Sequence, residues 1–218
     1  MSELRVQVNQ DSPRAISDGN WTSAKGTKRG ELCVIDFYTQ MAMEGRGYQL
    51  RVGTVTTGVT GDADITDTAA EACVDCTSGL TIIPCEVWIS YDTGEGDSQE
   101  CAIKSVATVS SAGTAFIPLP LLIGGAAAAS TARQDDEGGV TVTSELATTT
   151  LQHLHVTSEF AQALGTDSPP SNPIIWQPFV PPVLPGPRCF YIQIAAATTA
   201  PNYFLHADYL ELLTTQIS

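Results

Sequence analysis

The residues with the clearest chemical spacing are cysteines. Two of them form the motif Cys73-Val74-Asp75-Cys76, and Cys85 and Cys101 follow downstream. A zinc site of four cysteines uses two CxxC units, and here the second half lacks that spacing. A redox pair at Cys73 and Cys76 is an alternative interpretation. We favour a third, in which these residues are small buried thiols on an Ala-rich helix and on adjacent strands.

Histidines form the second set with metal-binding chemistry. His153 and His155 are two residues apart, so on a strand they share one face, and His206 can join them only through the fold. The sequence gives no sign that the three rings converge. We therefore interpret them as ordinary surface or half-buried histidines.

Acidic residues cluster twice, and both clusters have a simple interpretation. The first set loosely resembles a calcium loop, but it lacks the glycine and the distal bidentate glutamate of an EF-hand. Solvated loop carboxylates are the default for both. The sets are Asp62, Asp64 and Asp67, and Asp135-Asp136-Glu137.

Motifs that identify common enzymes are missing from the sequence. It contains no GxSxG, no phosphate loop, no HExxH and no GxGxxG between a strand and a helix. We therefore predict no catalytic residue, no bound cofactor and no metal, and we expect a protein that is not an enzyme.

The composition is that of a single β-domain that packs against neighbours. A length of 218 residues suits one sandwich or barrel. Charged residues make up only 16%, below the roughly 25% of ordinary soluble domains, so much of the surface must be neutral Thr, Ser, Gly, Ala and Pro. Such a surface favours contacts between subunits.

Cysteine spacing and hydropathy indicate where the protein is made. The six cysteines are not densely spaced, unlike those of small secreted domains. The first residues lack the apolar segment of a signal peptide, and no apolar run reaches the roughly 18 residues of a membrane span. We expect synthesis in a reducing cytoplasm and no membrane span.

The net charge of −14 is unevenly distributed. Through Arg51 the chain has seven basic and six acidic residues, a balance of +1, and the remainder has three basic and eighteen acidic, a balance of −15. An acidic, solvated body is the simpler interpretation. Alternatively, the N-terminal arm faces an anionic partner or an acidic neighbour. We do not expect the body to bind nucleic acid, because like charges repel, and only the arm remains a candidate.

Alternating hydrophobicity and turn signals predict about eight strands from Leu32 onward. We expect an all-β fold, an antiparallel β-sandwich with a jelly roll of about eight strands as its arrangement, one short helix and long loops. The predicted hairpins join 32–43 to 48–59, 80–91 to 100–110, and 188–194 to 203–212. Thr68-Ala69-Ala70-Glu71 is a capping-box pattern and predicts a helix that ends near Gly79.

Other stretches predict weaker elements. Residues 4–8 alternate as a short edge strand, and the prolines within 114–123 allow at most an edge strand there. Residues 124–139 have low complexity and predict an exposed loop. Strand composition resumes over 140–158.

Two segments are candidates for reaching neighbouring subunits. Residues 1–30 predict an extended arm that contains Trp21, and residues 31–218 predict one β-sandwich domain. Within this domain, residues 166–187 hold eight of the thirteen prolines and predict an extended Pro-rich strap without regular structure. The candidate subunit-contact anchors are Trp21, Trp176 and Phe179, since isolated aromatic residues in such segments usually pack against a core or a partner surface.

Three stretches carry a resemblance to a known class of proteins. They are Gly47-Tyr48-Gln49-Leu50-Arg51-Val52-Gly53-Thr54, Asp67-Thr68-Ala69-Ala70-Glu71, and the closing strand from Tyr203 to Leu213. In style the chain resembles the β-sandwich or jelly-roll virion structural proteins of bacterial viruses. The resemblance implies a capsid, decoration or spike-base subunit that is made in host cytoplasm and located in the virion. Its partners would be copies of itself and other virion proteins.

Two other functions remain open. One is a carbohydrate- or receptor-binding module of a spike or surface appendage, in which Trp88, Tyr91 or Trp176 forms a stacking platform. The other is a small jelly-roll enzyme that uses His153, His155 and an acid around a metal. A glycan array and metal analysis distinguish these from an assembly protein.

Overall fold

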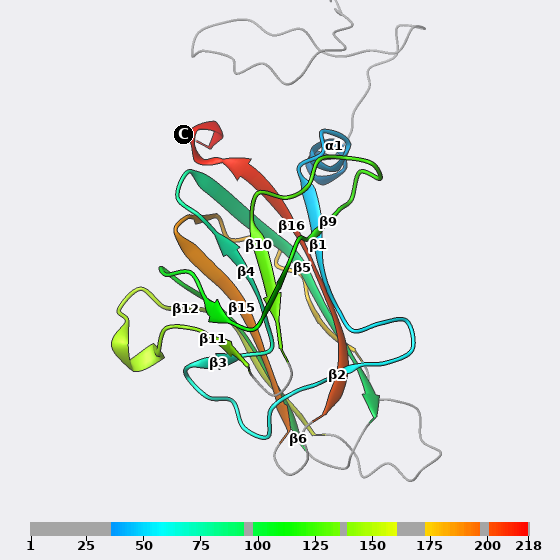
Figure 1. Cartoon of the computed structure of the whole chain (residues 1–218), viewed down its shortest axis with the longest axis vertical. Helices are drawn as coiled ribbons and strands as arrows, with labels where there is room; N and C mark the ends of the chain where they lie inside the picture. The colour runs from blue at the N-terminus through cyan, green and yellow to red at the C-terminus, as the bar shows by residue number, and fades with distance from the viewer. Residues whose placement is uncertain (1–35, 94–97, 136–138, 161–172, 197–200, 218) are drawn as a thin grey trace, which may run out of the picture.

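The computed structural model describes residues 36–93, 98–135, 139–160, 173–196 and 201–217 and shows two antiparallel sheets packed face to face (Figure 1). In spatial order the first sheet contains β13 (Ile174–Trp176), β5 (Leu80–Thr93), β16 (Asn202–Leu213), β1 (Gly47–Val52) and β9 (Leu119–Pro120), with β14 (Leu184–Pro185) beside β5 and β2 (Val59–Thr60) beside β16. The second contains β12 (Gln152–Phe160), β6 (Ser98–Val106), β15 (Arg188–Ala196), β4 (Ala72–Cys76), β10 (Thr131–Gln134) and β8 (Thr114–Phe116). The predicted all-β sandwich is confirmed, and the jelly-roll arrangement stays a prediction.

The core between the sheets is formed by strands in which buried apolar residues alternate with outward-facing residues. Along β16 every second residue from Tyr203 to Tyr209 is buried, and along β15 Phe190, Ile192 and Ile194 face the same core. Burial of each large apolar side chain contributes roughly 2 kcal/mol relative to exposure. This shared core fixes which face of each strand points outward.

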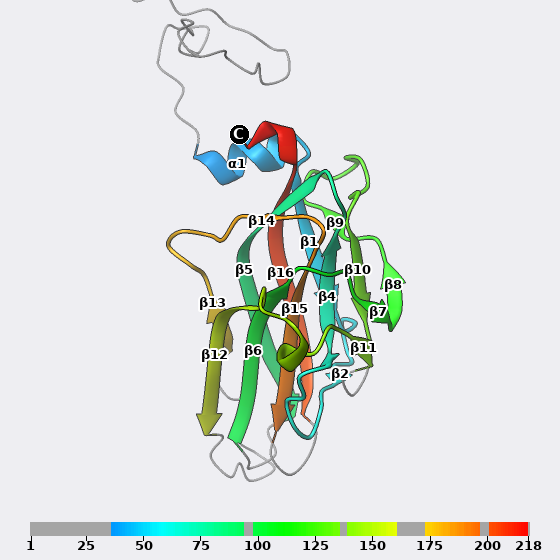
Figure 2. The same ribbon diagram turned by 90° about the vertical axis from the view of Figure 1, so that its left-hand side faces the viewer.

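A third, small sheet covers the outer face of the second sheet (Figure 2). It consists of β3 (Ala69–Ala70), β11 (Val140–Thr141) and β7 (Ser111–Ala112). Ala70 and Val140 of this layer pack with Cys73, Cys189 and Tyr191 of the second sheet in a separate apolar cluster. The two outer faces of the sandwich therefore differ.

Two of the predicted hairpins are wrong although their strands are placed correctly. β5 pairs with β16, and β6 pairs with β15, so each predicted pair is divided between the two sheets. Alternation determines which face of a strand is buried but not which strand lies beside it. The chain crosses from one sheet to the other between β5 and β6, and again between β15 and β16.

The first predicted hairpin is also wrong. Phe37–Met43 forms a short helix, α1, which begins where the Asp36 carboxylate accepts a hydrogen bond from the Thr39 N–H at 2.9 Å. β1 pairs instead with β16 and β9. Residues 32–35 and the predicted strand over 4–8 lie outside the described residues.

The predicted helix over 68–79 is wrong, since these residues contain β3 and β4. β4 is buried along its whole length, and tertiary burial on both faces outweighs the helical preference of alanine. The predicted loop over 124–139 contains β10, an inner strand of the second sheet. The edge prediction for 114–123 is confirmed, because β8 and β9 each end a sheet.

The described part of the Pro-rich strap lies against β5. The prediction that it lacks regular structure is wrong here, because β13 and β14 both pair with β5. Trp176 stacks on Phe190 with ring centroids 6.3 Å apart, inside the core. Residues 166–172, like the whole arm with Trp21, lie outside the described residues.

Candidate functional site

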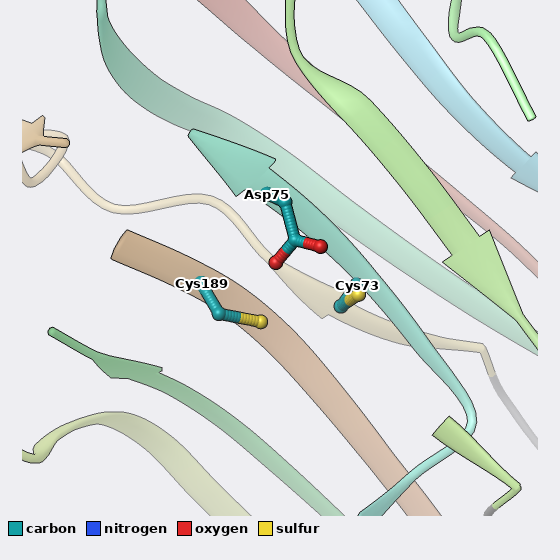
Figure 3. Close-up of side chains that lie close together, drawn as sticks. All are labelled: Cys73, Asp75 and Cys189. Atoms are coloured by element: carbon teal, nitrogen blue, oxygen red, sulfur yellow. The ribbon is translucent and has the colours of Figure 1, made fainter. Parts of the chain in front are cut away.

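Two cysteines and an aspartate meet on the outer face of the second sheet (Figure 3). Cys73 and Asp75 come from β4, Cys189 comes from β15, and their ligand atoms all lie within 4.8 Å of one another. β4 and β15 are paired with Asp75 directly opposite Cys189. Sequence spacing missed this cluster, because its members come together only through strand pairing.

Hydrogen bonds from Ser110 satisfy both oxygens of the buried Asp75 carboxylate. Its Oδ1 accepts the Ser110 N–H at 2.8 Å, and its Oδ2 accepts the Ser110 hydroxyl at 2.7 Å. Arg133 Nε lies 3.4 Å from Oδ2. The carboxylate therefore fastens the start of β7 and the neighbouring strand β10 to β4.

Cys189 and Cys76 are poor nucleophiles, because burial raises the pKa of each thiol. Burial raises the pKa of Cys189 well above its ordinary value, and the neighbouring Cys73 acts in the same direction. Burial also raises the pKa of Cys76 to about 11. Cys76 faces the core between the sheets, whereas Cys73 packs in the outer cluster, so Cys73 and Cys76 lie on opposite faces of β4. This geometry does not allow the pair to form a disulfide with each other.

The histidines do not converge. His206 is in the first sheet and His153 in the second, and the strand register shifts between His153 and His155. His153 Nε2 lies 3.5 Å from Glu145 Oε2, and His206 Nε2 lies 3.7 Å from Glu86 Oε1. Each of these two rings thus faces its own carboxylate.

The acidic residues of the loosely calcium-like stretch also have separate partners. Asp62 accepts the Ala63 N–H at 2.7 Å, and Asp67 accepts the Ser144 hydroxyl at 2.5 Å. Asp64 is exposed. The second acidic set extends over 136–137, outside the described residues.

Two hollows lined by residues that the structure describes lie on the outer face of the first sheet. The first, near α1, has a volume of about 490 Å³; we call it the end pocket. Tyr38, Leu121 and Phe179 form its apolar lining, and Glu86 and Asp208 are its acidic residues. These side chains come from α1, the segment after β9, the strap, β5 and β16.

The second hollow lies towards the other end of the same strands and has a volume of about 510 Å³; we call it the aromatic groove. Its lining includes Trp88 of β5, Phe204 and His206 of β16, and Arg51 of β1. Of the three aromatic residues predicted as a stacking platform, only Trp88 is exposed, because Tyr91 and Trp176 are buried. The sequence did not identify Arg51 and Phe204 as residues of this groove.

Exposed apolar residues gather at the α1 end of the sandwich. α1, the segment after β9 and the 3-10 helix η3 (Thr214–Gln216) lie together there (Figure 1). Arg46 joins η3 to this end by donating to Gln216 Oε1. The exposed apolar side chains of these segments, of β9, of the end of β16 and of the nearby strap are Phe37, Tyr38, Met43, Leu119, Leu121, Leu122, Ile123, Phe179, Val180, Val183, Leu213 and Ile217; we call them the apolar end surface.

Comparison with known proteins gives no match. No protein-family model fits the chain, and no curated protein and no solved structure shows significant similarity to it. Among the described residues, no helix is long and apolar enough to cross a membrane. The class of protein is therefore defined by the structure alone: an antiparallel β-sandwich with two hollows on one outer face and an apolar surface at one end.

Proposed function

We propose that this protein is a virion structural protein, a capsid or capsid-associated decoration subunit, that acts by self-assembly. The observation that carries the proposal is the apolar end surface. Its members come from several separate segments that lie at one end of the sandwich, and exposed apolar side chains gathered in one region mark interaction sites on soluble proteins. The low content of charged residues fits the same role.

The occupant that we assign to the end pocket is the N-terminal arm of a neighbouring copy. In the arm, Trp21 is followed by Lys25, Lys28 and Arg29, an aromatic anchor beside three positive charges. The end pocket has the complementary composition, an apolar lining with acidic Glu86 and Asp208. Such complementarity favours one partner and one orientation.

The connection has enough length to reach another subunit. The arm joins the described chain at Asp36, which caps α1 at the same end of the sandwich. Residues 22–35 separate Trp21 from this point, and an extended chain of that length spans roughly 45 Å. The arm of one copy can thus bridge to the end pocket of the next.

Phe179→Asp is expected to weaken self-association by at least about thirtyfold, which corresponds to about 2 kcal/mol, the loss typical of a central aromatic contact. The side chain is fully exposed in the single chain, so the fold should be unaffected. Leu146→Asp is the matched control, because Leu146 is equally exposed but lies in η2 (Glu145–Ala147), beside the second sheet. Sedimentation over a concentration series, with electron microscopy of the concentrated protein, measures the effect.

Deletion of residues 1–30 tests the arm separately. We expect the truncated protein to keep its melting temperature and to lose the large assemblies, and Trp21→Ala to reproduce part of that loss. Assemblies that form normally without the arm would overturn the proposal that the arm joins neighbouring subunits. A full-length protein that stays monomeric at high concentration would overturn self-assembly itself.

A further inference from the structure

The aromatic groove points to a binding function that assembly does not need. Strand pairing places Arg51 opposite His206, His206 opposite Trp88, and Trp88 opposite Ile175, so these residues form one row across four strands. Rows on the outer face of a twisted sheet are rigid, because the backbone of each strand is held by both neighbours. The groove is thus built on fixed positions.

An exposed aromatic platform lines this groove. Trp88 is 38% exposed although it lies in the middle of a long strand. Its ring meets His206 edge-on, with centroids 4.9 Å apart and an interplanar angle of 61°. The edge contact fixes the orientation of the Trp88 ring, and aromatic rings that remain exposed offer an apolar face to a ligand.

Gly53 extends the platform to Phe204. An added Cβ at Gly53 would lie 2.8 Å from Phe204 Cδ1, so the ring packs directly against bare backbone. Gly53 also has φ +90°, which other residues rarely adopt. The absence of a side chain at Gly53 therefore leaves space for the Phe204 ring beside the groove.

Arg51 gives the groove its charge preference. Its side chain is exposed and makes no hydrogen bond or ion pair with any residue that the structure describes, whereas Arg46 and Arg133 each face a carboxylate. The acids Glu86 and Asp208 lie one row away, towards the end pocket. A guanidinium is a fork that matches a carboxylate with two parallel hydrogen bonds.

We propose that the aromatic groove binds an acidic saccharide, with a sugar ring stacked on Trp88 and a uronic-acid carboxylate on Arg51. The apolar face of a pyranose ring suits the indole, and Ser90 and Thr54 supply hydroxyls for its polar edge. Neutral sugars would use the platform but leave Arg51 without a partner. Selectivity for the acid therefore comes from Arg51.

Calorimetric titration of the full chain with hexagalacturonic acid, and with neutral maltohexaose for comparison, tests the proposal. We expect the uronate to bind at least about tenfold more tightly, and its affinity to fall as salt is raised. Trp88→Ala should abolish binding of both sugars. Arg51→Gln should weaken uronate binding about tenfold and leave the neutral sugar unchanged.

Arg46→Gln is the matched control, since Arg46 flanks the same strand but already pairs with Glu44, outside the groove. It should bind like the unaltered protein. Equal binding of the two sugars, equal effects of the two arginine substitutions, or no uronate binding at millimolar concentration would each overturn the proposal. Because Arg51 is exposed, its substitution remains informative even if Trp88→Ala folds poorly.

Discussion

Asp75→Ala is expected to lower the free energy of unfolding by about 3 kcal/mol. The substitution leaves the Ser110 N–H and hydroxyl without their acceptor in a buried site. Each lost hydrogen bond to a charged group costs roughly 1.5–3 kcal/mol. It also leaves Arg133, which is partly exposed, without its carboxylate. Urea unfolding followed by fluorescence measures the difference.

Two companion variants make this result specific. Asp75→Asn keeps the shape and one acceptor oxygen, so we expect about half the loss. Asp64→Ala removes an exposed carboxylate of the same type and should change stability by no more than about 0.5 kcal/mol. If Asp75→Ala cost less than about 1 kcal/mol, the carboxylate would not be the fastening point of β7 and β10.

Glu71 is expected to make stability fall as pH rises. It lies between β3 and β4, where its Oε2 accepts the Ile194 N–H at 2.7 Å. Burial raises its pKa from 4.5 to about 8, opposed by the hydrogen bond from Ile194. An acid whose pKa is raised by folding holds its proton more tightly in the folded chain than in the unfolded chain.

The sign of the effect follows from this difference in proton binding. Below pH 4.5 both states are protonated at Glu71, and the stability contribution is complete. Between pH 4.5 and about 8 the unfolded chain has lost the proton and the folded chain still holds it, so the free energy of unfolding decreases. Above about 8 both states are ionised and the loss levels off.

Glu71→Gln should remove this pH dependence, because the amide oxygen can still accept the Ile194 N–H and no charge develops. As pH rises, the free energy of unfolding of the variant should therefore increase relative to that of the unaltered protein. The difference should reach up to several kcal/mol, at roughly 1.4 kcal/mol per pKa unit. Val55→Gln, at a nearly fully exposed position, should show no such trend. A stability difference between Glu71→Gln and the unaltered protein that is constant from pH 4 to 9 would contradict the buried-acid assignment.

The fold class could be predicted from sequence because alternation is a local property. β5 and β16 show it clearly, and each lies where the pattern places it. Strand partners could not be predicted in the same way, because the turn signals in the sequence after Thr93 and after Ala196 are compatible with pairing and with crossing to the other sheet. The choice depends on the packing of the whole core.

The error at β4 has a different origin. Thr68-Ala69-Ala70-Glu71 has the residue types of a helix start, but Glu71 binds the backbone of β15 instead of the start of its own helix. A capping pattern describes local hydrogen bonds only, and the buried sheet offers stronger competitors. Ala72 to Cys76 then continue as a strand buried on both faces.

Part of the aromatic groove was visible in the sequence. The sequence predicts Trp88 as a platform residue, and the alternation of apolar and polar residues places Arg51 on the polar face of its strand, opposite to Leu50 and Val52. That Arg51 lies across from His206 follows only from the register of β1 against β16. The Cys73–Asp75–Cys189 cluster likewise depends on register, which a single sequence does not contain.

The central place of β16 constrains how the chain is made. β16 lies between β5 and β1, so the first sheet has an open centre until residues 202–213 have been synthesised. Until then the edges of β1 and β5 that pair with β16 have no partner, and exposed strand edges are sites of aggregation. Pairing across so great a sequence separation is also slow. Nascent chains that stop before β16 should accordingly be insoluble, and the first sheet should form only after β16 has been synthesised.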